Sequence, residues 1–498
     1  MEFIGQIQKS IESNLLNNAL CISGQYYSYE KFAKTITKIR YAIQGDIDNT
    51  ETLIGLVTND DIETYASIIA LWLEGKAYVP VNPATPEERN KKVFGLTETQ
   101  FVLDSSTTSI YEEEFKVINT LTLEEKDIYL KPKEVNGEHL AYILFTSGTT
   151  GVPKGVPISF NNVNSLVNAI EAEPDFELTN SDRCLQMFEL TFDFSVVAYL
   201  FPFLAGACIY TIPKGAIKYF YVFKLIKEEK LTVLTMVPSI INYLRPYFDE
   251  INAPDVRYCS FGGGALHSDI AKEWSNCLPN CKIFNYYGPT EFTVYSGFYP
   301  YHKETDQKAH NGIIAIGRPQ KDTSYLIVDD KNEEVEINVT GELCLAGPQI
   351  TNGYWKNEEK NAKSFFVKNE KGAKVRYYKT GDLCFKDEDG DYLYVGRADF
   401  QVKIRGYRVE LAEIEFHAKA KTKSNIVALA IINKLGNAEI GLAIEAEESF
   451  DTKEMFGYMK TKIPDYMIPT HTRFINEFPH SINGKIDRKK LKEYFHIN

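Results

Sequence analysis

The sequence predicts an α/β protein with a large N-terminal domain of α/β sheet layers and a β-rich subdomain, followed by a small C-terminal α+β domain. Three successive patterns carry this prediction. Short apolar runs alternate with helical periodicity up to about residue 320, hairpin-like strands follow, and a mixture of helix and strand patterns begins near residue 400. Because 498 residues exceed what one compact core accommodates, we expect about two to four domains.

The clearest α/β unit covers residues 53–81. Its first part, "LIGLVT", is apolar and favours a strand, "DIETYASIIALWLEG" has helical periodicity closed by Gly75, and "AYVPVNP" is extended again. Ligands in such sheets bind beyond the carboxyl ends of the strands. Further buried strands, each ending in a polar or glycine-containing turn, are predicted at 99–105, 139–148, 231–238 and 281–288.

The later part of the chain shows a different sequence pattern. The segments "SYLIVDDKNEEVE", "GELCLAG" and "GDLCFKDEDGDYLYVG" alternate as hairpin strands do, with "DEDGD" as a turn. Beyond them, "RVELAEIEFHAKA" favours a helix, and "NIVALAII" and "EIGLAIEAE" favour strands. The join "GRADFQ" at 396–401 is the best boundary, so we predict domains at 1–398 and 399–498.

Composition excludes several classes of protein. Hydrophobic residues at 44% and charged residues at 25% are ordinary for a soluble globular chain. The net charge of -13 argues against binding to nucleic acid or to an anionic membrane. The apolar run "IIALWL" is far short of the roughly 20 residues that span a bilayer, and the N-terminus lacks the pattern of a signal peptide. We therefore expect a cytoplasmic protein without membrane insertion.

Cysteine and histidine spacing predicts no metal site. Eight cysteines and eight histidines are scattered along the chain, and the close pair Cys277 and Cys281 has no second pair or nearby histidine. We expect reduced thiols that are partly buried as small hydrophobic groups. No Ser-His-Asp arrangement is indicated by spacing either.

The segment "ILFTSGTTGVPKGVPIS" at 143–159 is the strongest binding signal. Its glycines let the backbone approach an anion, while amides, hydroxyls and one ammonium group supply donors, so it predicts a phosphate-binding loop. The spacing differs from that of the common P-loop, in which GK is followed by Ser or Thr. A flexible linker is the alternative interpretation.

Several blocks occur together in one order: "LFTSGTTGVPKGV", "LTFDFSV", "NYYGPTE", "GELCLAG", "YYKTGD", "GRADFQVKIRGYRVEL" and "NGKIDRK". In these blocks the chain resembles the amino-acid adenylation enzymes of the adenylate-forming superfamily, which also contains acyl-CoA synthetases and luciferases. The resemblance implies activation of an amino acid by ATP as aminoacyl-AMP, with release of pyrophosphate. It also implies transfer of the aminoacyl group to the phosphopantetheine thiol of a separate acyl or peptidyl carrier protein.

The same resemblance implies the residues that bind ATP and magnesium. Tyr287 would stack on adenine with Gly288 beside it, Thr290 would contact the α-phosphate, and Glu291 would bind Mg²⁺; a Gly-Pro turn with Tyr287 in a core is the alternative. The loop residues implied to bind the β- and γ-phosphates are Thr146, Ser147, Gly148, Thr149, Thr150, Gly151 and the catalytic Lys154.

Four positions nearer the C-terminus complete the implied machinery. Asp382 would accept the two ribose hydroxyls, and Arg397 would lie near ribose and phosphate. A hairpin turn at "TGD" and a surface ion pair are the alternatives for these two residues. Lys485 would reach between the carboxylate and the α-phosphate, and Asp399 would be the hinge about which the small domain rotates between the two half-reactions.

Asp193 in "LTFDFSVV" decides between classes of substrate. It matches the aspartate that pairs with the substrate ammonium in enzymes activating α-amino acids; the alternative is that it caps the following helix. The pocket should be tight and partly polar, suited to small or hydroxylated side chains, with Gly262 able to add depth. The other pocket positions implied by the resemblance are Phe194, Val197, Thr235, Ser260, Gly262, Tyr286, Val294 and Tyr295.

The chain stops soon after its lysine motif, so we expect a free-standing ligase. It is similar to D-alanine:carrier protein ligases, but Gly262 stands where those enzymes have a cysteine, and Tyr286 and Tyr295 are bulkier. Cell-envelope modification and natural-product synthesis both stay open, as does the oligomeric state.

The sequence also allows two other functions. An acyl- or aryl-CoA synthetase is disfavoured by Asp193. An inactive nucleotide-binding homologue with a partner-binding role is disfavoured because Lys154, Glu291, Asp382 and Lys485 are all present.

Overall fold

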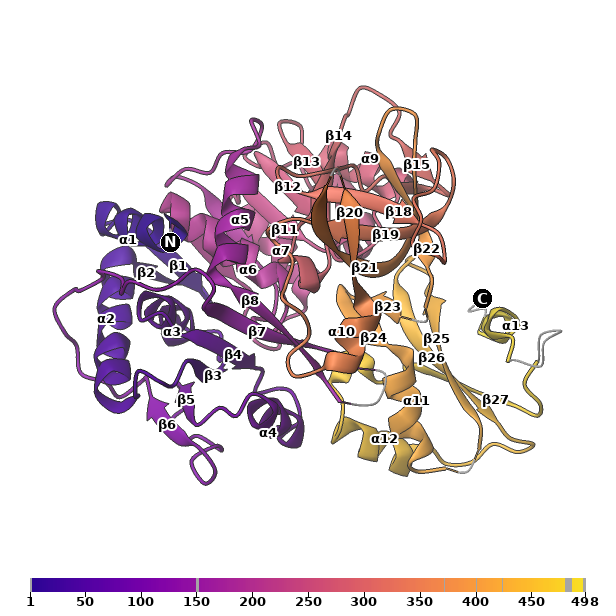
Figure 1. Ribbon diagram of the computed structural model, residues 1–498, viewed down its shortest axis with the longest axis horizontal. Coiled ribbons are helices and arrows are strands. Elements are labelled where there is room, and N and C mark those ends of the chain that lie inside the picture. The colour runs from indigo at the N-terminus through magenta and orange to yellow at the C-terminus, as the bar shows by residue number, and fades with distance from the viewer. Residues whose placement is uncertain are drawn as a thin grey trace. The chain divides into compact units, whose positions relative to one another are not determined.

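The computed structural model describes residues 2–148, 152–370, 372–399, 401–422, 424–479 and 486–495 (Figure 1). The chain divides into two compact units. The first consists of Met1–Asn82, Phe94–Leu144 and Gly155–Ala398, and the second of Pro83–Val93, Phe145–Lys154 and Asp399–Asn498.

The first unit contains a nine-stranded sheet that is parallel through its centre and antiparallel at its two edges. In spatial order its strands are β17 (Arg318–Pro319), β14 (Gly297–Tyr301), β13 (Lys282–Tyr287), β12 (Tyr258–Phe261), β11 (Val233–Met236), β9 (Arg183–Gln186), β10 (Cys208–Thr211), β1 (Asn18–Ile22) and β2 (Gln25–Ser28).

A six-stranded sheet lies in the N-terminal part of the chain, and its pairs β3–β4, β3–β5, β4–β7 and β5–β6 are parallel. Its order is β6 (Lys116–Asn119), β5 (Phe101–Asp104), β3 (Leu53–Val57), β4 (Ala77–Val81), β7 (Leu140–Thr146) and β8 (Lys154–Ser159). The helices before residue 399 are α1 (Glu2–Ser13), α2 (Tyr29–Asp46), α3 (Ile62–Leu73), α4 (Glu87–Leu96), α5 (Phe160–Glu171), α6 (Phe194–Ala205), α7 (Lys218–Glu228), α8 (Pro238–Leu244), η1 (Arg245–Glu250), α9 (Ser268–Cys277), η2 (Thr290–Phe292) and α10 (Glu358–Ser364).

The predicted strand, helix, strand unit at 53–81 is confirmed as β3, α3 and β4. The Asp61 side chain accepts a hydrogen bond from the backbone N–H of Thr64 and so caps α3. Gly75 ends the segment at φ +70°, and a Cβ there would lie 2.2 Å from Val135 Cγ2, so glycine is required. The four other predicted strands are confirmed as β5, β7, β11 and β13.

Both large sheets share one apolar core with the helices that pack on them. Within it, the hydroxyl groups of Tyr78 on β4 and Tyr199 on α6 hydrogen-bond at 2.8 Å, and both side chains are fully buried. Helix α6 also packs against β9, β10 and α1. This packing holds the N-terminal end of α6 in place.

The predicted β-rich subdomain is a five-stranded antiparallel sheet in the upper right of Figure 1. Its strands are β18 (Ser324–Val328), β19 (Gly341–Ala346), β21 (Ala373–Lys386) and β20 (Phe365–Glu370), with β22 (Tyr392–Arg397) paired to β21; the short strands β15 (Ala309–His310) and β16 (Ile313–Ile314) pair with each other.

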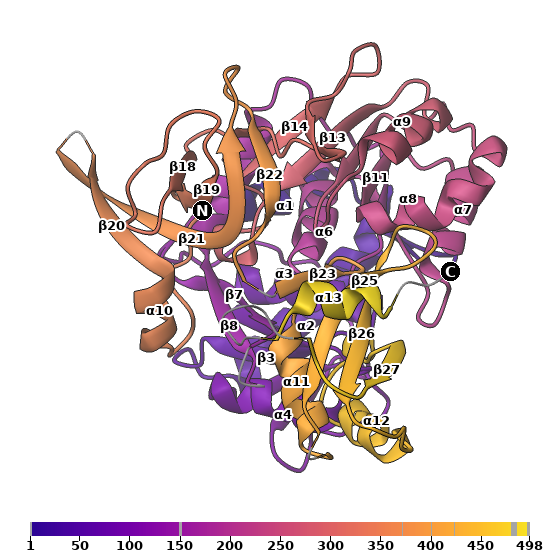
Figure 2. The same cartoon turned by 90° about the vertical axis from the view of Figure 1, so that its right-hand side faces the viewer.

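In the second unit, three strands are covered on both faces. Along β25, Ile426 and Ala428 pack in the cluster that includes α11, while Val427, Leu429 and Ile431 pack with residues of α13. Burial on both faces explains the continuous apolar run of this strand. The elements are β23 (Gln401–Ile404), β24 (Tyr407–Glu410), α11 (Leu411–Lys419), β25 (Ile426–Ile432), β26 (Ala438–Glu445), α12 (Lys453–Lys460), η3 (Asp465–Met467), β27 (His471–Ile475) and α13 (Arg488–Glu493), visible in Figure 2.

The predicted helix at 408–420 begins later than expected. Arg408–Glu410 belong to β24, because they pair with Gln401–Lys403 in an antiparallel hairpin, and α11 starts at Leu411. Within the described ranges, no helix is long and apolar enough to cross a membrane. All eight cysteines are buried and free.

A buried ion pair allows the stability of the first unit to be tested. Arg40 and Glu74 are 2.7 Å apart, and Arg40 also donates to the carbonyl groups of Tyr129 and Lys131. Replacing Arg40 with Ala leaves the buried Glu74 carboxylate with Lys133 as its remaining ion-pair partner, so we expect a loss of about 3 kcal/mol in the free energy of unfolding, the low end for a broken buried pair. Urea unfolding followed by tryptophan fluorescence measures it.

The control removes an exposed ion pair. Lys31 and Glu125 form such a pair, and both side chains are largely exposed. Lys31→Ala should change the free energy of unfolding by less than about 1 kcal/mol. Equal effects of Arg40→Ala and Lys31→Ala would contradict this account of the core.

Candidate active site

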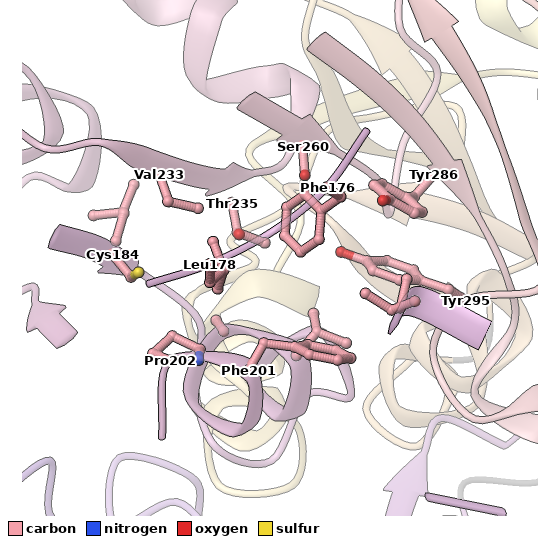
Figure 3. Close-up of a pocket in the computed structure, with 14 residues that line it drawn as sticks. Phe176, Leu178, Cys184, Phe201, Pro202, Val233, Thr235, Ser260, Tyr286 and Tyr295 are labelled. Atoms are coloured by element: carbon pink, nitrogen blue, oxygen red, sulfur yellow. The ribbon is translucent and has the colours of Figure 1, made fainter. Parts of the chain in front are cut away.

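Neighbouring strands of the nine-stranded sheet bring polar side chains to one face. Thr235 on β11 pairs in register with Ser260 on β12, and Ser260 pairs with Phe284 on β13. Tyr286 lies two residues beyond Phe284 and therefore points to the same face. Helix α6 lies beside this face, with Phe201 and Pro202 opposite Thr235 in Figure 3.

Asp193 occupies the N-cap position of α6 but does not cap it. Its φ and ψ are −61° and −32°, and its side chain makes no capping hydrogen bond, so the alternative interpretation as a helix cap is wrong. The side chain is buried, and Oδ2 accepts a hydrogen bond from the Thr290 hydroxyl at 2.7 Å. One hydrogen bond thus joins two positions that belong to different sequence blocks.

Glu291 is fully buried in the turn η2. Its Oε1 accepts a hydrogen bond from the Tyr354 hydroxyl at 2.5 Å, and the hydroxyl groups of Tyr354 and Tyr378 are 3.3 Å apart. The sequence interpretation assigned no role to either tyrosine. Tyr378 lies inside the quoted block "YYKTGD", which could have pointed to it, whereas Tyr354 lies outside every block.

Asp382 connects two predicted nucleotide contacts. Its Oδ2 accepts a hydrogen bond from the Tyr287 hydroxyl at 2.5 Å, and its Oδ1 accepts one from Arg397 at 2.8 Å. Arg397 also donates to the Thr380 carbonyl. Burial, and after it the nearby Asp382 carboxylate, raises the pKa of Tyr287 well above its ordinary value, so the phenol stays a neutral donor.

These contacts exclude the hairpin turn and the exposed ion pair, and the binding of ribose by Asp382 stays a prediction. Asp382 lies within β21 in register with Arg397 on β22, so it is a strand residue rather than part of a hairpin turn. The ion pair with Arg397 is largely buried rather than exposed at the surface.

The backbone around η2 is held in a strained turn. A Cβ at Gly288 would lie 2.2 Å from the Val294 carbonyl oxygen, so only glycine fits. Thr293 and Val294 have φ values of 52° and 72°, which cost β-branched residues of order 1–3 kcal/mol each. The Thr293 hydroxyl donates to the Gln349 carbonyl at 2.6 Å and helps to hold the turn.

A small cavity opens among the predicted substrate-pocket residues (Figure 3). Its volume is about 20 Å³, which is room for about one or two waters. Of the predicted positions, Val197, Thr235, Ser260, Tyr286 and Tyr295 line it. The other lining residues, which the sequence did not indicate, are Ile170, Phe176, Leu178, Cys184, Leu185, Ala198, Phe201, Pro202 and Val233.

The expectation that Gly262 adds depth to the pocket is wrong. A Cβ at Gly262 would lie 2.0 Å from the ring of Phe194, so this ring occupies the space that glycine leaves. Phe194 in turn meets Tyr295 edge to face, with ring centroids 5.0 Å apart. Of the predicted pocket positions, Asp193, Phe194, Gly262 and Val294 are not among the residues that line the cavity.

Within the phosphate-loop segment, the described residues from Phe145 to Lys154 belong to the second unit. Thr146 ends β7, and the Ser147 hydroxyl donates to the Arg408 carbonyl at 2.8 Å. Lys154 forms an ion pair with Glu410 at 2.9 Å. Among the predicted residues, Thr149, Thr150, Gly151 and Lys485 lie outside the described residues.

Two further predicted positions are held by local contacts in the same unit. The N–H of Gly148 donates to Glu413 at 3.2 Å, and a Cβ at Gly148 would lie 2.0 Å from the Val152 carbonyl oxygen. The Asp399 carboxylate accepts a hydrogen bond from the N–H of Gln401 at 3.1 Å.

With this geometry in view, the comparisons identify the family. The model of the AMP-binding enzyme family matches residues 9–355, so the chain belongs to that family. Within the part of the chain that the structure describes, no group of three or more His, Cys, Asp or Glu side chains is arranged to hold a metal ion.

Two relatives and one solved structure illustrate the similarity. Tyrocidine synthase 3 of Brevibacillus parabrevis is 29% identical over 98% of this chain, but the chain spans 7% of that synthase's length. D-alanine--D-alanyl carrier protein ligase of Bacillus licheniformis is 31% identical, with 86% of each chain covered. The fold matches that of the Vibrio cholerae adenylation domain AlmE, solved with glycyl-adenosine-5'-phosphate, with a TM-score of 0.85, 22% identity, and 99% and 97% of the two chains covered.

A substitution at Gly288 tests the strained turn. Gly288→Ala would force the Val294 carbonyl away and displace Thr290 and Glu291, so we expect at least about a tenfold loss in affinity for AMP. Isothermal titration calorimetry measures the affinity. Gly396→Ala is the control, because a Cβ there meets nothing within 4 Å; an equal loss in both variants would refute the role of the turn.

Proposed function

We propose that this protein activates an α-amino acid with ATP and passes it to the phosphopantetheine thiol of a separate carrier protein. The observation that carries the proposal is the 2.7 Å hydrogen bond between Asp193 and Thr290. In an α-amino acid the ammonium and carboxylate groups are attached to the same carbon. If the ammonium group pairs with Asp193, the carboxylate therefore lies beside the Thr290 hydroxyl, which is proposed to contact the α-phosphate. The two reactants are thereby oriented for attack.

The chemistry in the first step is a displacement at phosphorus. A carboxylate oxygen bonds to the α-phosphorus of ATP while the bond from that phosphorus to the bridging oxygen breaks, and pyrophosphate leaves. Thr290 donates to the α-phosphate, and Lys154 with the hydroxyl-rich loop receives the charge of the leaving pyrophosphate. Lys485 is proposed to lie between carboxylate and phosphate. Such cations and donors are needed because two anions meet.

The nucleoside part of ATP has a matching site. Tyr287 offers a ring for adenine, and Asp382 offers carboxylate oxygens for the ribose hydroxyls. Because Tyr287 and Arg397 both donate to Asp382, the carboxylate is held in position before ATP arrives. The buried contacts support this role for the three residues.

Glu291 is the residue that would hold Mg²⁺. One carboxylate suffices, because this ion keeps several waters and takes its remaining ligands from phosphates. The ion would supply positive charge to the transferring phosphoryl group. Tyr354 is a positioning residue, since its hydroxyl group fixes one oxygen of Glu291.

In the second step the thiol sulfur bonds to the carbonyl carbon of the aminoacyl adenylate, and the bond from that carbon to the phosphate oxygen breaks, releasing AMP. We propose that Asp399 is the hinge at which the domain 399–498 turns between the steps. The relatives support a carrier protein as the acceptor, since one acts with a D-alanyl carrier protein. As a consumer of ATP, the enzyme is proposed to work in the cytoplasm.

Exchange of labelled pyrophosphate into ATP tests the first step. We expect exchange that depends on an amino acid and on Mg²⁺, and no exchange with fatty or aryl acids. Exchange that depends on a fatty or aryl acid would instead favour the acyl-CoA synthetase alternative.

Asp193→Asn should raise the KM for the amino acid about a hundredfold or more and leave the KM for ATP unchanged, because the variant keeps an acceptor for Thr290 but loses the charge.

Asp104→Asn is the matched control, because Asp104 is also a buried carboxylate that accepts side-chain and backbone hydrogen bonds. Its KM values should stay within about twofold of the parent enzyme. An unchanged KM for the amino acid in Asp193→Asn would show that Asp193 does not bind the amine.

A second prediction concerns the support of Glu291. Tyr354→Phe should raise the Mg²⁺ concentration needed for half-maximal exchange by about tenfold, because a residue that holds a metal ligand in place commonly contributes this much to metal affinity. Tyr377→Phe is the control, since Tyr377 donates in the same way to Glu370 in the β20–β21 pair. The same Mg²⁺ dependence in both variants and the parent would exclude a positioning role for Tyr354.

A further inference from the structure

Four hydroxyl groups meet at the cavity that the substrate side chain would enter. They belong to Thr235, Ser260, Tyr286 and Tyr295, all of which line it. Figure 3 shows the oxygen atoms of Thr235, Ser260 and Tyr295 turned toward the enclosed space. The rings of Tyr286 and Tyr295 stack with centroids 4.1 Å apart, and both residues line the cavity.

Within the described ranges, none of these four hydroxyl groups hydrogen-bonds to another group of the protein. All four residues are buried or nearly so. Burial, as the largest cause, raises the pKa values of Tyr286 and Tyr295, so both phenols are neutral and act as donors and acceptors. These hydroxyl groups line the cavity, and an apolar occupant would leave them unpaired, so the cavity suits a ligand that can hydrogen-bond.

The remaining lining excludes a charged ligand group. The other described lining residues are apolar side chains and the thiol of Cys184, whose pKa is raised well above its ordinary value, mainly by burial. No lining residue is charged, so an ammonium, guanidinium or carboxylate group would lose its hydration there without gaining an ion pair in the lining. The carboxylates of Glu173 and Asp193 act on Tyr286 and Tyr295 but do not line the cavity. The group that fills the cavity is therefore neutral.

The walls limit the length of the side chain. The stacked rings of Tyr286 and Tyr295 form one wall, and the Phe194 ring fills the space at Gly262. The cavity that is left has a volume of about 20 Å³. A hydroxyl or carboxamide group on a short stem fits such a space. An aromatic or long aliphatic side chain requires the walls to move.

We propose that the amino acid activated here has a short, neutral, hydrogen-bonding side chain of the serine, threonine or asparagine kind, recognised by the hydroxyl groups of Thr235, Ser260, Tyr286 and Tyr295. This inference rests on the proposed function, because it names the substrate of the same site. A polar side chain supplies hydrogen-bond partners to these four hydroxyl groups, whereas an apolar side chain of equal size leaves them unpaired.

Matched pairs of amino acids test the proposal by pyrophosphate exchange with the full chain. Serine is compared with alanine, threonine with valine, and asparagine with leucine, each as both enantiomers, alongside the other proteinogenic amino acids. We expect one polar member to have the highest kcat/KM of the panel, and to exceed its apolar partner by about a hundredfold or more.

Variants assign the discrimination to the hydroxyl groups. Tyr295→Phe and Thr235→Val each keep the shape of the wall and should lower kcat/KM for the polar substrate about tenfold, while changing that for its apolar partner less than about twofold. Tyr247→Phe is the control, because Tyr247 lies partly exposed near Phe223, outside the cavity. A Tyr295→Phe enzyme that loses activity equally on both partners would contradict recognition by this hydroxyl group.

The outcomes separate this inference from the proposed function. If an apolar, charged or aromatic amino acid has the highest kcat/KM, the enzyme is an amino-acid ligase but the inference on its side chain is wrong. If no amino acid supports exchange in a preparation that binds ATP, the proposed function itself is overturned, and the inference falls with it.

Discussion

The candidate site depends on the packing of helix α6 against the nine-stranded sheet. Nearly every residue of this helix is buried, and its contacts with β9, β10 and α1 leave it little freedom to slide or turn. Asp193 and Phe194 stand at its first turn, and Val197 and Pro202 line the cavity farther along. Because the helix is fixed by the core, the carboxylate at its end and the walls of the pocket are fixed relative to the strands.

The polar groups of the site are supported by other buried polar groups rather than by solvent. Asp382 receives hydrogen bonds from Tyr287 and Arg397, and Glu291 receives one from Tyr354. Each carboxylate is thereby held in one orientation at the cost of removing it from water. We propose that carboxylates held in this way present their oxygens to ribose and to Mg²⁺ without reorganising during the reaction.

The turn after β13 shows how backbone strain serves the same end. Thr293 and Val294 adopt left-handed conformations that β-branched residues avoid, and Gly288 permits the Val294 carbonyl to lie against its backbone. The turn places Thr290 beside Asp193 and returns the chain so that Tyr295 stacks on Tyr286. The same few residues thus connect the proposed nucleotide site with the pocket for the side chain.

By itself the sequence determined the alternation of strands and helices, the β-rich part, and the residues in the motif blocks, because periodicity and short-range turn chemistry are local properties. Only the tertiary structure decided which of these residues meet. Tyr287 and Asp382 are 95 positions apart in the chain, and Asp193 and Thr290 are 97 apart. Neither the contact of Phe194 with Gly262 nor the support of Glu291 by Tyr354 leaves a local pattern, since both arise from the packing of distant elements. The size and polarity of the pocket follow from such contacts, so they were decided by the fold.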